Sequence, residues 1–366
     1  MSQKSIKKIV LTGGPCAGKT TALVRINTHF SALGYKVFTI PEVPTMVTQS
    51  GWNYLTGNHD FYYEGEKVIL ELQLALEEKI ERMAATCKEP CVIVCDRGAM
   101  DISAYISPEM WNELTASCGT STEELKGSRY DAVLHLVSAA DGAEQYYTVA
   151  NNAQRYEQAD EAGLALARSL DKKIIQAWTG HHRLRVINNG EDFEGKLNRV
   201  IKEISAVLEL PQPIEEERKY IVEVTGELPE CIKSEITQTY LVAEPGCEVR
   251  LRQRVSNGNV TNIHSTRRRT SDTEELVTER LISNNLYETM LQQADPYRHP
   301  IVKNRKSFIW KGQFFELDTY TVPEHLLILE TKGITNHEEL RLPPFLRIVE
   351  DITGNKKYYN YNLALK

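Results

Sequence analysis

The stretch KKIVLTGGPCAGKT at residues 7–20 decides the fold of the first half of the chain. Its apolar start is followed by G-x-x-x-x-G-K-[ST], and a helical pattern begins near Lys19. Glycines in this position let successive backbone N–H groups converge on phosphate oxygens at the positive end of a helix. We therefore predict a strand, a phosphate-binding loop and a helix. The alternative is a glycine-rich turn without a ligand, which this strand and helix context disfavours.

The predicted loop carries its own set of nucleotide ligands. Lys19 would supply a cation to the β- and γ-phosphates, and the hydroxyl of Thr20 would hold Mg²⁺. The predicted cofactors are Mg²⁺ and either ATP or GTP, and the motif does not choose between the two bases. The nucleotide-binding residues expected here are Gly13, Gly14, Pro15, Cys16, Ala17, Gly18, Lys19, Thr20 and Thr21.

Strand-like and helix-like segments alternate on both sides of this loop. Continuous apolar runs occupy residues 7–12, 35–40, 91–95, 131–137 and 183–188. Helical patterns occupy 64–86, 155–178 and 192–208. Such alternation predicts an α/β domain with a parallel sheet covered by helices on both faces. In the helical segment 64–86, the spacing predicts a buried apolar stripe made of Ile69, Leu72, Leu76, Ile80 and Met83.

Two carboxylates follow predicted strands and should face the loop. Asp96 and Arg97 come directly after the strand at 91–95, and Glu42 follows the strand at 35–40. Ligands gather at the carboxyl edge of a parallel sheet. Asp96 would hold Mg²⁺ or accept a proton from a substrate hydroxyl, while Arg97 would bind phosphate. The alternatives are that Asp96 caps the next helix and pairs with Arg97, and that Glu42 is a solvated loop residue.

The pattern changes near Pro211. The stretch at 209–213 contains two prolines, and beyond it charges alternate with apolar residues, as at 248–255 and 313–322. A helix does not cross such prolines, and alternation is typical of strands with one buried face. We therefore predict two domains, 1–210 and 212–366, the second an antiparallel sheet or barrel.

Charged pairs at i and i+2 recur along the second domain. Side chains two residues apart share one face of a strand, so these pairs would line one side of the sheet. Charges of both signs suit a water-filled barrel interior. There, basic side chains would bind a polyphosphate and acidic side chains would bind a divalent metal. The alternative is a solvated outer face. The expected polyanion-binding residues are Lys219, Arg250, Arg252, Lys303 and Arg305, and the expected metal-binding residues are Glu215, Glu217, Glu316, Asp318 and Glu330.

Composition narrows the range of partners. The 366 residues hold 43 Lys and Arg against 50 Asp and Glu, a net charge of −7. This balance argues against a protein that coats nucleic acid, so any polyanion site must be a local pocket. No run of apolar residues is long enough to span a bilayer, and residues 1–8 are too polar to open a signal peptide. We expect a cytoplasmic protein.

Cys87, Cys91 and Cys95 are predicted to be buried thiols rather than zinc ligands.

The placement of Asp96-Arg97 and Glu42 after their strands resembles that in the nucleoside-kinase and nucleotide-kinase branch of P-loop proteins. In that branch an arginine-bearing helical lid lies between the fourth and fifth strands, which implies that Arg155 is a catalytic lid residue. Its alternative is an i,i+4 surface pair. WTGHHRLRVINN at 178–189, followed by Phe193 and Lys196, resembles the end of a predicted ATPase domain related to nicotinamide-riboside kinases. That resemblance implies a loop beside the nucleotide base.

The second domain resembles the CYTH family of triphosphate tunnel enzymes over roughly 215–366. The resemblance implies a tunnel barrel that binds triphosphate or an inositol phosphate headgroup. This sequence departs from the catalytic members at two places. Lys332 replaces an acidic residue, and Arg267, Arg268 and Arg269 replace a single basic residue. We therefore expect anion binding with little need for Mg²⁺ and slow or absent hydrolysis. The matching segments are EEERKY (215–220), QTYL (238–241), RLR (250–252), Lys303 with Arg305, FELD (315–318), Leu329-Glu330, PPF (343–345), EDIT (350–353) and 358–360.

A kinase-like P-loop domain followed by a CYTH barrel resembles the TRPL translocation defect protein family. That family is described as nucleotide-binding, with GTP preference and phosphoinositide binding suggested. Two functions follow. The first is an enzyme that hydrolyses a nucleotide or transfers its phosphoryl group to a small acceptor. The second is a non-catalytic regulator whose barrel holds a phosphate-rich anion under nucleotide control, a role compatible with peripheral membrane contact. A scaffold without either activity is disfavoured because Lys19, Thr20 and Asp96 occur together.

Overall fold

A computed structural model gives the fold of the chain. It describes residues 6–53, 57–147, 161–189, 192–213, 218–256, 258–271, 274–311, 313–323, 326–331 and 340–366. The chain divides into two compact units, Met1–Glu203 and Ile204–Lys366. Among the described helices, none combines the length and the apolar character that crossing a membrane requires.

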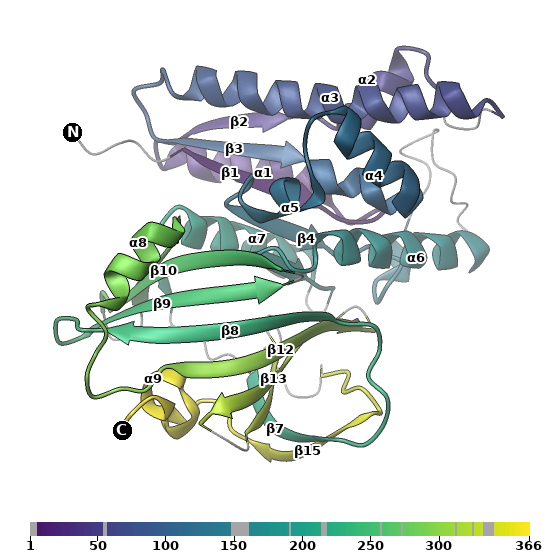
Figure 1. The fold of residues 1–366 in the computed structure, drawn as a ribbon. Coiled ribbons are helices and arrows are strands. Elements are labelled where there is room, and N and C mark those ends of the chain that lie inside the picture. Colours follow the sequence, from purple (N-terminus) through teal and green to yellow (C-terminus); the bar gives the residue numbers. More distant parts are fainter. Residues whose placement is uncertain are drawn as a thin grey trace. The chain divides into compact units, whose positions relative to one another are not determined.

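The first unit is built on a five-stranded parallel sheet with the order β2-β3-β1-β4-β5 (Figure 1). The central strand β1 is almost completely buried, because its residues Ile9, Val10 and Leu11 are packed on both faces. All five predicted strands of this domain are confirmed within a residue or two. Their bounds are β1 Lys7–Thr12, β2 Lys36–Ile40, β3 Cys91–Asp96, β4 Ala132–Leu136 and β5 Leu184–Ile187.

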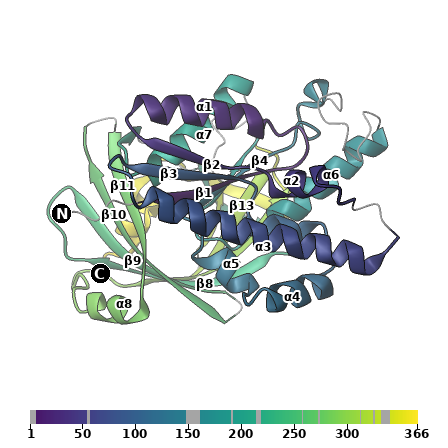
Figure 2. The same ribbon diagram turned by 90° about the horizontal axis from the view of Figure 1, so that it is seen from above.

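Helices cover both faces of this sheet, as the alternating pattern predicts. Figure 2 shows α1 and α7 on one face and α3, α4 and α5 on the other. Cys91 and Cys95 lie inside the sheet as buried thiols. The helical elements are α1 Lys19–Ala32, α2 Val43–Gln49, α3 His59–Ala84, the 3₁₀ turn η1 Ala99–Ala104, α4 Pro108–Ser117, α5 Thr122–Gly127, η2 Glu144–Tyr146, α6 Glu161–Trp178 and α7 Phe193–Val207.

The predicted apolar stripe of α3 is wrong in part. Ile69 is buried, but Met83 at the other end of the stripe is 49% exposed. The buried face contains three polar side chains instead, Glu66, Gln73 and Glu77. A rule that places only apolar residues inward misses them because this face borders a polar cavity and a buried ion pair rather than a plain hydrophobic core.

The second unit is a ten-stranded sheet with the order β15-β7-β14-β13-β12-β8-β9-β10-β11-β6, and every pairing in it is antiparallel. Its predicted strands at 248–255 and 313–322 are confirmed as β9 and β13. The bounds are β6 Gln212–Pro213, β7 Arg218–Val224, β8 Ile232–Leu241, β9 Cys247–Ser256, β10 Asn259–Arg269, β11 Glu274–Ile282, α8 Asn284–Leu291, β12 Ile301–Trp310, β13 Gln313–Val322, β14 Leu327–Thr331, β15 Leu346–Asp351, the 3₁₀ turn η4 Lys356–Tyr358 and α9 Asn360–Leu363.

Two aromatic-rich clusters stabilise the second unit. One packs Tyr220, Phe308 and Phe315 together, and the other packs Tyr240 with Tyr320. The rings of Phe308 and Phe315 stack with their centroids 5.6 Å apart. The first cluster lies on the face of the sheet opposite to the charged residues, whereas Tyr240 and Tyr320 lie on the charged face, where Lys303 Nζ donates to the Tyr320 hydroxyl at 3.4 Å. Both clusters tie together strands that are distant in sequence.

Candidate functional site

The phosphate loop connects β1 to α1 and needs its glycines. Gly13 and Gly18 both have positive φ, at 143° and 88°. A Cβ on Gly13 would lie 2.1 Å from the carbonyl oxygen of Leu136, and one on Gly18 would lie 2.6 Å from the ring of Phe193. Neither position accepts a side chain, because both the backbone conformation and the space exclude one. The loop is therefore preshaped by its neighbours.

A buried carboxylate on α6 holds the loop from behind. Asp171 Oδ1 accepts hydrogen bonds from the backbone N–H of Gly14 at 2.7 Å and of Ser138 at 3.3 Å, and lies 3.1 Å from His135 Nε2. Burial alone would raise the pKa of Asp171, but His135 and these hydrogen bonds lower it. Sequence reasoning missed Asp171, whose only signal is an acid on the inward side of an apolar helical stripe.

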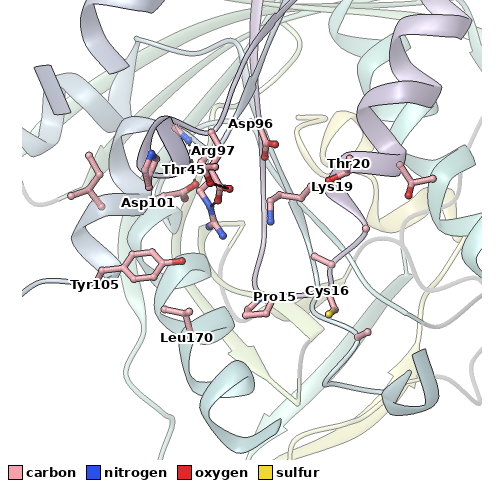
Figure 3. Close-up of a pocket in the computed structure, with 18 of the residues that line it drawn as sticks. Pro15, Cys16, Lys19, Thr20, Thr45, Asp96, Arg97, Asp101, Tyr105 and Leu170 are labelled. Atoms are coloured by element: carbon pink, nitrogen blue, oxygen red, sulfur yellow. Dashed lines mark hydrogen bonds and ion pairs between the residues drawn. The ribbon is translucent and has the colours of Figure 1, made fainter. Parts of the chain in front are cut away.

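A cavity of about 1100 Å³ opens in front of the loop. Figure 3 shows Lys19, Asp96, Arg97 and Asp101 around it, with Tyr105 at its side. The predicted loop residues 15–21 all line the cavity, together with Glu42. The structure thus brings the predicted cation, hydroxyl and carboxylates of the first domain to one place.

The charges of Lys19 and Asp96 are poorly solvated in this cavity. Burial lowers the pKa of Lys19, and the nearby Arg97 lowers it further. Burial raises the pKa of Asp96. The Asp96 Oδ1 atom is buried and accepts no hydrogen bond from any described residue. Lys19 Nζ contacts only the carbonyl oxygen of Gly13 among the hydrogen bonds of the described chain, at 3.2 Å. Both groups are therefore placed to gain interactions when a charged ligand enters.

Arg97 is held by Glu42. Its Nε donates to Glu42 Oε1, and its guanidinium lies 5.9 Å from the centroid of the Tyr105 ring. Burial would raise the pKa of Glu42, but Arg97 and Lys19 together lower it to about 2. Glu42 is therefore an ionised partner of Arg97 rather than a solvated loop residue, and Asp96 does not form the ion pair with Arg97 that the capping alternative requires.

A second aspartate fixes the loop that carries Asp96 and Arg97. Asp101 Oδ2 accepts from the hydroxyl of Thr12 at 2.7 Å and from the N–H of Gly98 at 3.2 Å, and Asp101 Oδ1 accepts from Trp178 Nε1 at 2.6 Å. It is 2% exposed. The sequence places it five residues after Asp96, a signal that could have identified it.

The side of the cavity near α7 is formed by Asn189, Asp192, Phe193 and Lys196. Lys196 Nζ donates to the carbonyl of Val137 and to Asn189 Oδ1, each at 2.7 Å, and burial lowers its pKa to about 7. Of the stretch 178–189 with Phe193 and Lys196, expected beside the nucleotide base, the end lines the cavity through Asn189, Phe193 and Lys196, whereas its start does not. Trp178 is fully buried against Asp101, and His181 binds the carbonyl oxygen of Tyr130, so this start packs inside the unit.

The opposite side of the cavity is lined by α3 and by Trp52. Tyr62, Glu66, Ile69 and Gln73 face it at spacings of four, three and four residues, which is one helix face. Glu66 is 6% exposed. Sequence reasoning missed these residues, and the signal was present as polar residues at helical spacing.

We expect a pH dependence of stability from Glu66. Its burial raises its pKa to about 7, although a hydrogen bond with Tyr62 acts in the opposite direction. Between its unfolded value near 4.5 and 7 the folded chain keeps a proton that the unfolded chain has lost. The free energy of unfolding should therefore fall as the pH rises through this window, by about 3 kcal/mol.

Urea denaturation of the wild type and Glu66→Gln across this window measures the effect. The Gln variant should lack this part of the slope, while Glu64→Gln, an exposed position on the same helix, should keep it. Equal slopes in the wild type and Glu66→Gln would show that Glu66 titrates normally.

In the second unit, the register places the predicted charged residues on one face. Residues opposite each other in an antiparallel pair point to the same side. Glu330 lies opposite both Lys219 and Glu316, and Arg305 lies opposite Asp318. Arg252 and Arg250 lie opposite Gln238 and Tyr240, on the same face of β8 as the positions opposite Lys303 and Arg305. The alternation in the sequence is therefore borne out in the sheet.

Several of these charges are paired with one another. Lys219 Nζ lies 2.9 Å from Glu330, Lys303 Nζ lies 2.5 Å from Asp318, and Arg305 contacts Glu316, Asp318 and Glu330 at 2.6, 2.6 and 3.1 Å. Within the described part of the chain no group of three or more His, Cys, Asp or Glu side chains could hold a metal. Of the acids expected to bind metal, Glu316, Asp318 and Glu330 contact lysine or arginine side chains, and their role as metal ligands stays a prediction.

Three arginines of β9 lie on this same face. Arg252 contacts Glu279 at 2.9 Å, but its Nε is buried with no hydrogen-bond partner among the described residues. Arg250 lies 3.9 Å from the same carboxylate, and Arg254 Nε donates to the hydroxyl of Ser234. Burial lowers the pKa of Arg254 to about 10. Arg254 was missed, although it continues the alternation of Arg250 and Arg252.

Four predicted residues fall outside the described parts of the structure. They are the lid residue Arg155, the acids Glu215 and Glu217, and Lys332. Their roles stay predictions.

Comparisons with known proteins complete this description. Curated proteins offer no match to the chain. The solved structure of the inorganic triphosphatase NE1496 is 26% identical, with a TM-score of 0.32, and covers 42% of this chain and 96% of its own. Shikimate kinase from Acinetobacter baumannii in complex with shikimate is 15% identical, with a TM-score of 0.33, and covers 56% of this chain and 94% of its own.

The sequence of the first unit matches a known family. Residues 8–196 fit the family described as AAA domain. This range covers half of the chain and contains the phosphate loop, Asp96 and the supporting Asp101 and Asp171. The chain therefore belongs to this AAA domain family.

Proposed function

We propose that the first unit binds a Mg²⁺–nucleoside triphosphate and transfers its γ-phosphoryl group to a small hydroxyl-bearing acceptor or to water. The observation that carries this proposal is the meeting of Lys19 and an unsatisfied Asp96 carboxylate across one cavity in front of a preshaped phosphate loop. A cavity of about 1100 Å³ is large enough for a nucleotide and a second small molecule.

In the proposed reaction, the acceptor oxygen attacks the γ-phosphorus. The new oxygen–phosphorus bond forms as the bond to the β,γ-bridging oxygen breaks, and that electron pair leaves with the nucleoside diphosphate. The acceptor's proton passes to the carboxylate of Asp96, which lines the same cavity as Lys19. Lys19 and Arg97 neutralise charge that develops on the phosphoryl oxygens. Glu42 keeps the Arg97 guanidinium in place.

The residues present fit a magnesium ion. The hydroxyl of Thr20 and the orphaned Asp96 Oδ1 line the same cavity, and Mg²⁺ prefers one or two such oxygens together with phosphates. When bound, Mg²⁺ would supply neutralising charge to the β- and γ-phosphates. The test is nucleoside diphosphate formation from Mg-ATP and Mg-GTP by the purified full chain. Tight nucleotide binding without any product would favour the second function below.

A second function rests on the β9 arginines. We propose that Arg250, Arg252 and Arg254 bind a compact polyanion such as triphosphate or an inositol phosphate headgroup. Nucleotide binding in the first unit would regulate this binding. Arg252 lies 2.9 Å and Arg250 lies 3.9 Å from the carboxylate of Glu279, and the buried Nε of Arg252 has no hydrogen-bond partner among the described residues. A multiply charged anion would satisfy these donors without a metal. Hydrolysis of that anion should be slow or absent.

Replacing Arg252 should weaken polyanion binding. We expect Arg252→Gln to lower affinity for tripolyphosphate and for inositol hexakisphosphate about tenfold, the effect of one lost charge-assisted contact. Calorimetry with EDTA present, in a Lys19→Ala background that removes the phosphate loop as a competing site, measures it. The control is Arg280→Gln, an exposed position on β11. Equal losses in both variants would mean that only general charge attracts the anion.

A further inference from the structure

The backbone of Arg97 adopts a conformation that side-chain-bearing residues rarely take. Its φ is 70°, in the left-handed region, where the Cβ of any residue other than glycine crowds the backbone. The other non-glycine residues of the described chain with positive φ are Cys16, Glu209 and Lys311. Arg97 differs from the last two because it lines the cavity of the first unit. Such strain persists only where neighbouring groups hold the backbone in place.

This conformation turns the chain at the end of β3 and aims the Arg97 side chain into the cavity. The Arg97 N–H still donates to the carbonyl of Leu11 at 3.0 Å, as a continuation of the pairing between β1 and β3. Its guanidinium pairs with Glu42 and lies 3.4 Å from the carbonyl oxygen of Gly13. Figure 3 shows the side chains of Arg97 and Lys19 pointing toward the same space. A different φ at Arg97 would carry the guanidinium away from it.

The turn after Arg97 is held by the carboxylate of Asp101. Asp101 Oδ2 accepts from the N–H of Gly98 at 3.2 Å and from the hydroxyl of Thr12 at 2.7 Å. Asp101 Oδ1 accepts from Trp178 Nε1 at 2.6 Å. Gly98 is also enclosed, since a Cβ there would lie 2.7 Å from the ring of Trp178. One buried carboxylate therefore joins the turn to the end of β1 and to the end of α6.

An amide in place of Asp101 could not accept from all of these donors. An asparagine side chain has one oxygen, so its NH₂ group would face either the Gly98 N–H or the Trp178 N–H. A buried N–H that loses its acceptor raises the free energy of the folded chain. Without the carboxylate, the turn would therefore relax and Arg97 would return to an ordinary backbone conformation.

We propose that Asp101 is a positioning residue for phosphoryl transfer, which holds Arg97 in its left-handed conformation and thereby keeps the guanidinium in the cavity. Strain in the Arg97 backbone accompanies that placement. The inference rests on the proposed function, because it takes Arg97 to stabilise the transferring phosphoryl group. It deepens that function by assigning the placement of Arg97 to a second carboxylate, which acts through the backbone.

The first test measures the strain and needs no activity. Arg97→Ala and Arg97→Gly both remove the guanidinium, but only glycine adopts positive φ without crowding. In scanning calorimetry of the full chain, the glycine variant should melt at least about 2 °C above the alanine variant. The matched control is Arg82→Ala with Arg82→Gly, because Arg82 is exposed in the helix α3. There glycine should melt below alanine, and this pair also identifies the transition of the first unit.

The second test asks whether Asp101 holds the strained turn. In an Asp101→Asn background, Arg97→Gly should melt no higher than Arg97→Ala, because the relaxed turn no longer requires positive φ. If the glycine variant has no advantage in the wild-type background, or keeps its full advantage beside Asp101→Asn, the proposal is wrong. Should Asp101→Asn fail to fold, Trp178→Phe takes its place and should shrink the difference, because it removes the indole N–H that orients Asp101. An undiminished difference in that background would equally overturn the proposal.

Rates then test the effect on the reaction. Single-turnover phosphoryl transfer or hydrolysis by Asp101→Asn should be about tenfold slower than by the wild type, because the guanidinium is displaced. Nucleotide affinity, measured by calorimetry, should stay within about twofold, since Lys19 and the phosphate loop are unchanged. A wild-type rate in a folded Asp101→Asn chain, or an equal loss of rate and affinity, would contradict positioning. If the wild type itself has no activity, the proposed function fails, while the melting comparison still decides whether Asp101 holds Arg97.

Discussion

Replacing Lys19 with alanine is expected to weaken Mg-nucleotide binding by about 2 kcal/mol or more, which is about 30-fold in affinity. Lys19 lies at the start of α1, where the loop N–H groups and the positive helix end also attract phosphate. Its pKa is lowered by burial, so phosphate would also stabilise a desolvated charge. Isothermal calorimetry with Mg-ATP and Mg-GTP measures the change.

The matched control is Lys36→Ala, because Lys36 is exposed at the start of β2. It should bind nucleotide like the wild type. A folded Lys19→Ala chain with unchanged affinity would remove the phosphate-loop assignment, whatever happens to activity.

Replacing Asp96 with asparagine is expected to slow phosphoryl transfer or hydrolysis by at least about 100-fold, the usual contribution of a positioned acid or base. Asparagine keeps the size of the side chain but removes the charge that would accept a proton or hold Mg²⁺. Nucleotide should still bind, because Lys19 and the loop N–H groups are untouched. Product formation under single-turnover conditions, with calorimetry beside it, separates the rate from the affinity.

Asp60→Asn is the control for this change, since Asp60 is an exposed residue in the first turn of α3. Its rate should equal that of the wild type. If Asp96→Asn retains the full rate, Asp96 is not the acid or base of the reaction, and the regulatory function is left as the better account of the first unit.

Much of the fold could be predicted because its signals are local. The strands at 7–12 and 91–95 are continuous apolar runs, and the structure buries both between helices. The stripe of α3 could not be predicted in the same way. Met83 fits the spacing yet is half exposed, while Glu77 is fully buried because Arg129 and Tyr130, from a distant segment, satisfy its carboxylate. Periodicity does not contain such long-range partners.

The candidate site likewise contains residues that local sequence signals predict and residues that only the packed structure identifies. Lys19, Thr20 and Asp96 follow strands directly, so a parallel sheet must bring them to one edge. Asp171 lies on α6, far along the chain, and its role depends on the N–H of Gly14 pointing at it. Only the packed structure shows that contact.

In the second unit, alternation predicts which face the charges share but not how they pair. Arg305 occupies an inward position, as predicted, yet its guanidinium is taken up by Asp318, Glu316 and Glu330. Opposite charges on adjacent strands satisfy each other at distances that no spacing within one strand can report. On β9, the buried Nε of Arg252 has no hydrogen-bond partner among the described residues, and the polyanion proposal now rests on that strand.

The most direct test of the central claim is a structure of the full chain determined with Mg²⁺ and the β,γ-imido analogues of ATP and GTP. The account predicts that the triphosphate of at least one analogue lies along residues 13–20, with the γ-phosphate within hydrogen-bonding reach of Lys19 Nζ and facing Asp96. A triphosphate that points away from Asp96, or analogues that bind only to the second unit, would contradict it.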